Sequence, residues 1–216
     1  MAYRNDDSTV PSAVTPLVDV YIATLPEHRP IGKVLCAERM NEILSASNGM
    51  VKRERYFVWK LLCHALKNSF GIDETDARFV KESTGRWTLD GIYLSISHSK
   101  GALAVAVSGS PVGIDIELLG ERKNSRFPER ILAEEEHKEY KKLPPEKKDS
   151  FILSVWTAKE AIFKSKGKSA FIPSSIDTLR ENHRTGFIKI ADCEYVWSVA
   201  TDDRDALRVF TDIYLD

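Results

Sequence analysis

The sequence lacks the features of a membrane protein or a secreted, disulfide-rich one. No apolar run approaches the roughly 18 residues that a membrane-spanning helix needs, and the first residues do not resemble a secretory signal. The three cysteines, Cys36, Cys63 and Cys193, form no C-x-x-C pair, so we expect buried free thiols in a reducing cytoplasm. No two histidines are spaced i, i+4, which argues against a histidine-based transition-metal site.

Net charge is also almost absent. The 31 Lys and Arg residues against 32 Asp and Glu residues leave a formal charge of −1, which argues against a dedicated nucleic-acid-binding protein. With 43% hydrophobic and 29% charged residues the composition is that of a globular protein, and 216 residues suffice for one large domain or two small ones.

Helical and strand patterns alternate along the chain in two blocks. Residues 1–16 are polar and predict a flexible N-terminal arm. Helices followed by strands over 17–110, and again over 111–216, predict an α+β fold of two lobes with a boundary near residue 110. The expected helices span 34–46, 51–70, 129–143 and 149–167, the last with Asp149 as N-cap; the expected strands span 17–23, 77–82, 92–97, 102–108, 112–117, 186–191, 194–201 and 206–215.

The stretch G-I-D-I-E at 113–117 has two carboxylates on one strand face. Strand alternation places Asp115 and Glu117 together, opposite the apolar face that carries Ile114 and Ile116. Two such acids repel each other unless water, a base or a cation offsets the repulsion, and their oxygens suit Mg²⁺ or Mn²⁺. On this stretch alone, a solvated strand face is the simpler explanation.

The predicted helix at 149–167 aligns three different side chains. Trp156, Glu160 and Lys164 are spaced i, i+4, i+8 and share a face. They could hold a ligand, a metal and a phosphate. A surface Glu–Lys pair beside a core tryptophan is common, however, and by itself is the simpler explanation.

The stretch S-I-S-H-S-K-G at 95–101 ends a strand in a small polar turn. Its hydroxyls, imidazole and backbone N–H groups suit a phosphate-binding corner, and a β-turn capped by its own serines fits equally well. Ser97 and His98 point to opposite strand faces, so a Ser–His nucleophile pair would be poorly placed.

The motifs S-x-S-H-S, G-I-D-I-E and W-T-A-K-E-A, in this order over roughly residues 50–170, resemble the 4′-phosphopantetheinyl transferase superfamily, in particular its surfactin-synthetase-activating type. The resemblance implies a monomer with two similar, pseudo-twofold-related lobes and the active site at their cleft. It implies Mg²⁺-dependent transfer of the phosphopantetheine arm of coenzyme A to a serine of an apo acyl or peptidyl carrier protein. The products would be adenosine 3′,5′-bisphosphate and the holo carrier, and Mn²⁺ could replace Mg²⁺.

The resemblance also assigns roles near the metal and the diphosphate. Asp115, Glu117 and Glu160 match the family's metal ligands. Lys159 and Lys164 match its diphosphate-contacting lysines. Glu160, as a metal ligand, and Lys164, as a diphosphate contact, are expected to take part in catalysis. The metal and the cations would stabilise the charge of the transferring phosphoryl group.

Further positions correspond to the family's coenzyme A contacts. His98 matches the histidine on the 3′-phosphate, with Ser97 beside it. Gly85-Arg86-Trp87 stands where the family often has Gly-Lys-Pro, so Arg86 is expected to contact a phosphate with a different geometry. The remaining candidates for the 3′-phosphate, which no motif places and which could equally be exposed helix charges, are Arg53, Arg55 and Lys33.

The run Glu134-Glu135-Glu136 falls where the family carries a general base. Glu136 is the expected base, with its neighbours as alternatives in register, and a solvated helix face explains the run equally well. Trp156 is expected to pack and position its helix. Carrier proteins are acidic, so we expect a local basic rim to meet them. Its candidates are Arg122, Lys123, Arg126, Arg130, Lys138, Lys141 and Lys142.

Two other functions share these residues. A Mg²⁺-dependent diphosphate hydrolase or nucleotidyltransferase would use the same carboxylates and would leave the carrier serine unmodified. A non-catalytic module that binds carrier proteins or coenzyme A would show no metal-dependent turnover. The ordered W-T-A-K-E-A motif argues against the first alternative, and the intact acids argue against the second.

Overall fold

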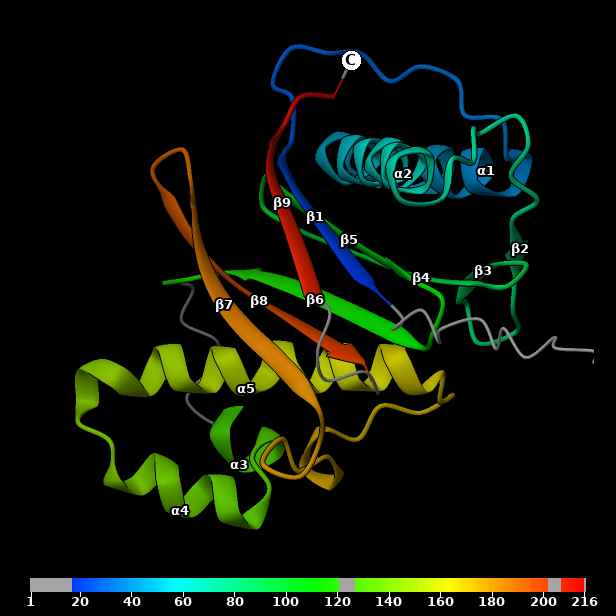
Figure 1. Cartoon of the computed structure of the whole chain (residues 1–216). Coiled ribbons are helices and arrows are strands. Elements are labelled where there is room, and N and C mark those ends of the chain that lie inside the picture. The colour runs from blue at the N-terminus through cyan, green and yellow to red at the C-terminus, as the bar shows by residue number, and fades with distance from the viewer. Residues whose placement is uncertain (1–16, 121–126, 202–206, 216) are drawn as a thin grey trace, which may run out of the picture.

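The computed structural model describes residues 17–120, 127–201 and 207–215, and it confirms an α+β fold (Figure 1). A six-stranded sheet has the order β2-β3-β4-β5-β1-β9, and a three-stranded sheet has the order β6-β8-β7. The strands are β1 Val18–Thr24, β2 Val80–Lys81, β3 Trp87–Leu89, β4 Ile92–Ser99, β5 Ala102–Ser108, β6 Val112–Leu118, β7 His183–Ile190, β8 Cys193–Thr201 and β9 Leu207–Ile213. The helices are α1 Ala37–Ser45, α2 Gly49–Phe70, α3 Phe127–Ile131, α4 Glu134–Lys142, α5 Pro145–Lys166 and the 3₁₀ turn η1 Pro173–Ser175.

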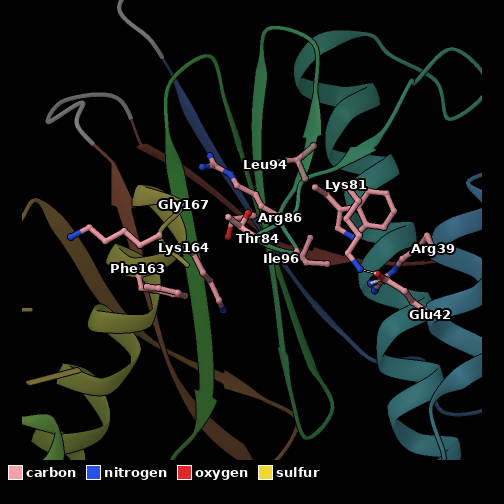
Figure 2. A pocket seen from close by; sticks show the side chains of 14 residues that line it. Arg39, Glu42, Lys81, Thr84, Arg86, Leu94, Ile96, Phe163, Lys164 and Gly167 are labelled. Carbon is pink, nitrogen blue, oxygen red and sulfur yellow. Dashed lines mark hydrogen bonds and ion pairs between the residues drawn. The ribbon is translucent and has the colours of Figure 1, made fainter. Parts of the chain in front are cut away.

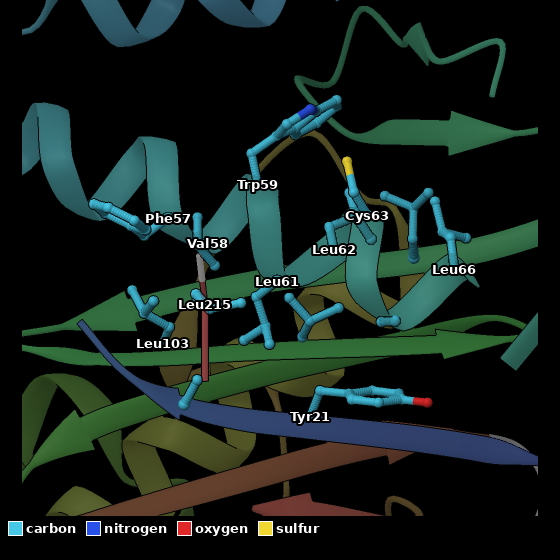
Figure 3. Close-up of a cluster of buried hydrophobic side chains, with 14 of the residues drawn as sticks. Tyr21, Phe57, Val58, Trp59, Leu61, Leu62, Cys63, Leu66, Leu103 and Leu215 are labelled. Atoms are coloured by element: carbon cyan, nitrogen blue, oxygen red, sulfur yellow. The ribbon is translucent and has the colours of Figure 1, made fainter. Parts of the chain in front are cut away.

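The two sheets pack between two long helices. Alternation along β1 and β5 sends Tyr21 and Leu103 toward α2, where they meet Leu61 and Leu62 in the main core (Figure 3). The opposite face of the six-stranded sheet packs on the three-stranded sheet, and α5 covers the far side of the latter (Figure 1). No helix in the described part of the chain combines the length and the apolar character needed to cross a membrane.

The last strand crosses back to the first sheet. β9 pairs in parallel with β1, with Leu207 opposite Val18. The six-stranded sheet therefore takes strands from both ends of the chain. The boundary near residue 110 and the pseudo-twofold relation between the lobes stay predictions.

Several expected elements differ in their bounds. The single helix expected at 129–143 is two helices. The first ends at Ile131, and at the start of the second the Glu136 side chain accepts a hydrogen bond from the Ala133 backbone N–H. The helix expected from Asp149 begins at Pro145, since proline at the first helical position sacrifices no intrahelical hydrogen bond. The strand expected at 77–82 is reduced to Val80–Lys81.

Among the cysteines, Cys63 is buried, and burial raises the pKa of its thiol to about 12, whereas Cys193 is exposed, contrary to expectation.

Gly113 allows α5 to lie directly on β6. A methyl group at this position would lie 2.0 Å from the carbonyl oxygen of Ala161 and 2.5 Å from the backbone nitrogen of Ser165, both backbone atoms of α5. Only a residue without a Cβ permits this approach. It brings the helix face of Glu160 and Lys164 against Asp115.

We therefore expect Gly113→Ala to lower the free energy of unfolding by about 1–3 kcal/mol, the usual cost of overpacking. Urea denaturation measures this loss. Gly109→Ala is the matched control, because a methyl group there meets no atom within 4 Å, and it should change stability by under about 0.5 kcal/mol. Equal stability of the two variants would contradict the proposed close packing.

Candidate functional site

A pocket of about 270 Å³ opens where β4, β6, α2 and α5 meet; we call it the central pocket. Arg39, Arg55 and His98 of the N-terminal half form its basic end, whereas the acids of β6 and α5, together with Lys164 of α5, form its acidic end. The acidic end can bind a cation, and the basic end beside it can bind an anion. Its lining residues are Arg39, Arg55, Ile96, Ser97, His98, Asp115, Ile116, Glu117, Glu160 and Lys164.

Side chains of β4 hold β6 in place. The Ser97 hydroxyl donates to Asp115 Oδ1 at 2.7 Å, and the Ser99 hydroxyl donates to Glu117 Oε2 at 2.9 Å. Ser95 Oγ accepts the backbone N–H of Ile114 at 3.0 Å. The serines of the S-x-S-H-S motif thus orient the acids of G-I-D-I-E, a role that neither interpretation of this stretch from the sequence, the phosphate corner or the self-capped turn, included.

Lys164 lies among the carboxylates. Its Nζ is 2.7 Å from Asp115 Oδ1 and 3.6 Å from Glu160 Oε2, and it donates to the carbonyl of Ile114 at 3.1 Å. Burial lowers the pKa of Lys164, but Asp115 and then Glu160 raise it more, so the pKa lies above its ordinary value and the ammonium stays charged.

The carboxylate oxygens of Asp115, Glu117 and Glu160 are the kind of ligand that a hard cation such as Mg²⁺ prefers, but in this structure they do not form a metal site. Among the described residues, no three His, Cys, Asp or Glu side chains are grouped closely enough to hold a metal ion. Asp115 Oδ2, however, is buried with no hydrogen-bond partner in that part of the chain. A buried carboxylate oxygen of this kind is costly unless a ligand uses it, and Asp115, Glu117 and Glu160 all line the central pocket.

Sequence reasoning missed two residues at the basic end of the central pocket, namely Arg39, which lines the pocket, and Glu54, which contacts the lining residue His98. Arg39 is buried, donates to the carbonyl of Arg55 at 2.7 Å and pairs with Glu42 at 2.9 Å. Glu54, also buried, lies behind His98, with its Oε2 3.3 Å from the imidazole Nδ1. The sequence held one signal for Arg39. It is a charged residue on the apolar face of a predicted helix, four residues before the buried Ile43.

A second pocket, of about 310 Å³, adjoins the central pocket and shares Arg39, Ile96 and Lys164 with it; we call it the side pocket (Figure 2). Arg86 lines it, with its guanidinium 5.4 Å from the ring centroid of Tyr93. Within the described residues, Arg86 Nε and Nη2 are buried without hydrogen-bond partners. Such a guanidinium suits an anionic ligand.

Two of the expected site residues contact each other and line neither pocket. Lys159 and Glu136 are fully buried, with Lys159 Nζ 2.6 Å from Glu136 Oε2. Glu136 Oε1 also accepts the backbone N–H and the hydroxyl of Thr178, at 2.9 and 2.7 Å. Burial raises the pKa of Glu136, but Lys159 and these donors lower it more, so the carboxylate stays ionised. Lys159 points here because it is one residue, about 100° of helix, from Glu160.

Other expected residues also lie outside the pockets. Arg53 donates to the backbone carbonyls of Pro26, Glu27 and Arg29 and so anchors the segment after β1, while Lys33 is exposed. Trp156 packs on Phe171 with ring centroids 5.4 Å apart, the packing role expected for it.

Part of the expected basic rim lies on α3 and α4. Arg130, Lys138, Lys141 and Lys142 are exposed there. Lys138 pairs with Glu135 at 2.6 Å and Lys142 with Glu139 at 2.7 Å, which reduces their net field. Arg122, Lys123 and Arg126 lie outside the described residues.

Comparison with known proteins agrees with the motifs. Residues 111–209 match the family model of the 4′-phosphopantetheinyl transferase superfamily. The chain is 23% identical over 155 residues to a 4′-phosphopantetheinyl transferase of Bacillus subtilis, covering 65% of this chain and 69% of that protein. It is 33% identical over 96 residues to the transferase gsp of Aneurinibacillus migulanus (44% and 40%), and 34% over 89 residues to AcpT of Salmonella typhi (40% and 46%).

Residues 111–209 are thus similar to the 4′-phosphopantetheinyl transferase superfamily, which confirms the resemblance inferred from the motifs. The chain spans 69% of the Bacillus subtilis relative and less than half of the other two. Asp115, Glu117, Glu160 and Lys164 all fall in the matched region.

Proposed function

We propose that this protein transfers the 4′-phosphopantetheine arm of coenzyme A to a serine of an apo acyl or peptidyl carrier protein, as a cytoplasmic monomer that requires Mg²⁺. The observation that carries the proposal is the central pocket, where bases of the N-terminal half face the three acids of the family motifs. A diphosphate bound to a divalent cation has this distribution of charge.

The metal would be held by Asp115, Glu117 and Glu160, and it would stabilise negative charge on the diphosphate oxygens. Asp115 Oδ2 supports this assignment, since it is a buried acceptor without a partner among the described residues. Ser97 and Ser99 fix the orientation of the two β6 acids. Such outer hydrogen bonds commonly tune metal affinity.

Lys164 is the cation placed to act in the transfer. Its ammonium contacts Asp115 and Glu160, so it can move onto a phosphate oxygen that binds beside these acids. When the carrier serine attacks the phosphorus, its hydroxyl proton passes to a water molecule, the phosphodiester to the carrier forms, the diphosphate bond breaks, and adenosine 3′,5′-bisphosphate leaves. Lys164 would stabilise the charge that spreads over the phosphoryl oxygens.

The other cations divide between anchoring the ligand and supporting the fold. We propose that Arg55 and His98 bind phosphate groups in the central pocket and that Arg86 binds an anionic group in the side pocket. Lys159 and Glu136, being buried in one ion pair, would support the helices instead of contacting the diphosphate or accepting the serine proton. The exposed bases of α3 and α4 would steer an acidic carrier toward the site.

Intact-mass spectrometry tests the reaction. The protein is incubated with coenzyme A, Mg²⁺ and a mixture of apo acyl and peptidyl carrier proteins, with EDTA in a parallel sample. We expect a carrier to gain the mass of one phosphopantetheine arm only where free metal is present. Cleavage of coenzyme A with an unmodified carrier would indicate the hydrolase alternative, and coenzyme A binding without any product would indicate the binding module.

A further inference from the structure

The turn between β4 and β5 is held by contacts from α2, from β8 and from the segment after β1. Lys100 and Gly101 form this turn with φ angles of 43° and 95°. Glu54 of α2 accepts the backbone N–H of Gly101 at 3.4 Å, and Tyr195 of β8 donates its hydroxyl to the carbonyl of Lys100 at 2.7 Å. The backbone N–H of Leu25 donates to the carbonyl of Gly101 at 2.8 Å. The end of strand β4, which carries His98, therefore has a defined position.

Glu54 also contacts His98 itself. The imidazole Nδ1 donates to Glu54 Oε2 at 3.3 Å, and only 8% of the glutamate side chain is exposed against 28% of the histidine. The hydrogen bond from His98 lowers the pKa of Glu54 more than burial raises it, so the buried carboxylate is ionised. The buried Glu54 carboxylate therefore fixes the Nδ1 edge of the His98 ring and leaves the opposite edge for a ligand.

We propose that Glu54 is a positioning residue that orients the His98 imidazole toward a phosphate monoester group of the nucleotide ligand. Because Nδ1 is engaged by Glu54, Nε2 is the nitrogen left to meet a phosphate oxygen in the central pocket. This inference rests on the proposed function and adds Glu54 to the residues that select the donor.

Calorimetry measures the binding of coenzyme A and of 3′-dephospho-coenzyme A in the presence of Mg²⁺ and without a carrier. We expect Glu54→Gln to weaken the binding of coenzyme A about tenfold, since it removes a charge-assisted hydrogen bond while retaining an acceptor for Gly101. Binding of the dephosphorylated ligand should change less than about twofold. Glu74→Gln is the matched control, because Glu74 is a partly buried acid that accepts the Leu35 backbone N–H outside both pockets, and it should alter neither affinity.

A second comparison separates positioning from mere support of the turn. In a His98→Ala background, Glu54→Gln should have no further effect on either ligand, because its role passes through the imidazole. Equal weakening of both ligands, a full additional loss in the His98→Ala background, or unchanged affinities would each overturn the inference. Transfer by the wild-type protein in the mass assay tests the proposed function independently, so the two failures are distinguishable.

Discussion

Asp115→Asn is expected to reduce phosphopantetheine transfer by about 10³-fold while the protein stays folded. The substitution keeps the side-chain shape and an acceptor for Ser97, but it removes the negative charge that contacts Lys164 and that we assign to the metal. Electrostatic groups aimed at a transferring centre contribute 10²–10³-fold or more to rate. Initial rates of carrier modification by mass spectrometry measure the loss.

The control for this experiment is a buried aspartate far from the pockets. Asp19 is 2% exposed and is held by Arg208 at 2.6 Å and by Ser69 at 2.6 Å. Asp19→Asn should lower stability while the folded fraction keeps its activity. If Asp115→Asn were as active as Asp19→Asn, the assignment of Asp115 to the metal would be wrong.

Lys159→Met is expected to lower the free energy of unfolding by about 3–5 kcal/mol, because it leaves Glu136 as an unpaired buried charge. The double variant Lys159→Met/Glu136→Gln should regain much of this loss, since it removes both charges together and keeps an amide oxygen for the donors of Thr178. Urea denaturation measures all three free energies. A double variant less stable than Lys159→Met would contradict the description of the two residues as one buried pair.

The same pair predicts how stability depends on pH. The pKa of Glu136 is lower in the folded state than in the unfolded state, where it is about 4.3. Its contribution is therefore fully present above pH about 4.3 and is lost as the pH falls through the folded-state pKa. The wild-type protein should lose more stability in acid than Glu136→Gln does, and parallel curves would contradict this.

Local periodicity predicted the residues of the acidic end well. Strand alternation placed Asp115 and Glu117 on one face, and helical spacing placed Glu160 beside Lys164, as the structure has them. These relations depend only on the geometry of one element. Helical geometry also implies that Lys159 points away from Glu160, although its match to a family motif suggested otherwise.

Contacts between side chains of different elements could not be predicted from the sequence. Glu54 meets His98 because α2 packs on β4, and no pattern within either element encodes that register. Lys159 meets Glu136 because α3 ends at Ile131 and the chain then starts a separate helix, α4, which packs against α5. β9 likewise joins β1 across nearly the whole chain, a pairing that β-strand patterns cannot specify.

The most direct test of the account is to locate the metal. Crystals grown with Mn²⁺ and coenzyme A would be measured near the manganese absorption edge. We expect an anomalous peak in the central pocket, within coordination distance of Asp115, Glu117 and Glu160, with the diphosphate beside it and Lys164 on a phosphate oxygen. A manganese ion bound elsewhere, with Lys164 still on Asp115 and coenzyme A outside the pocket, would contradict the proposed site.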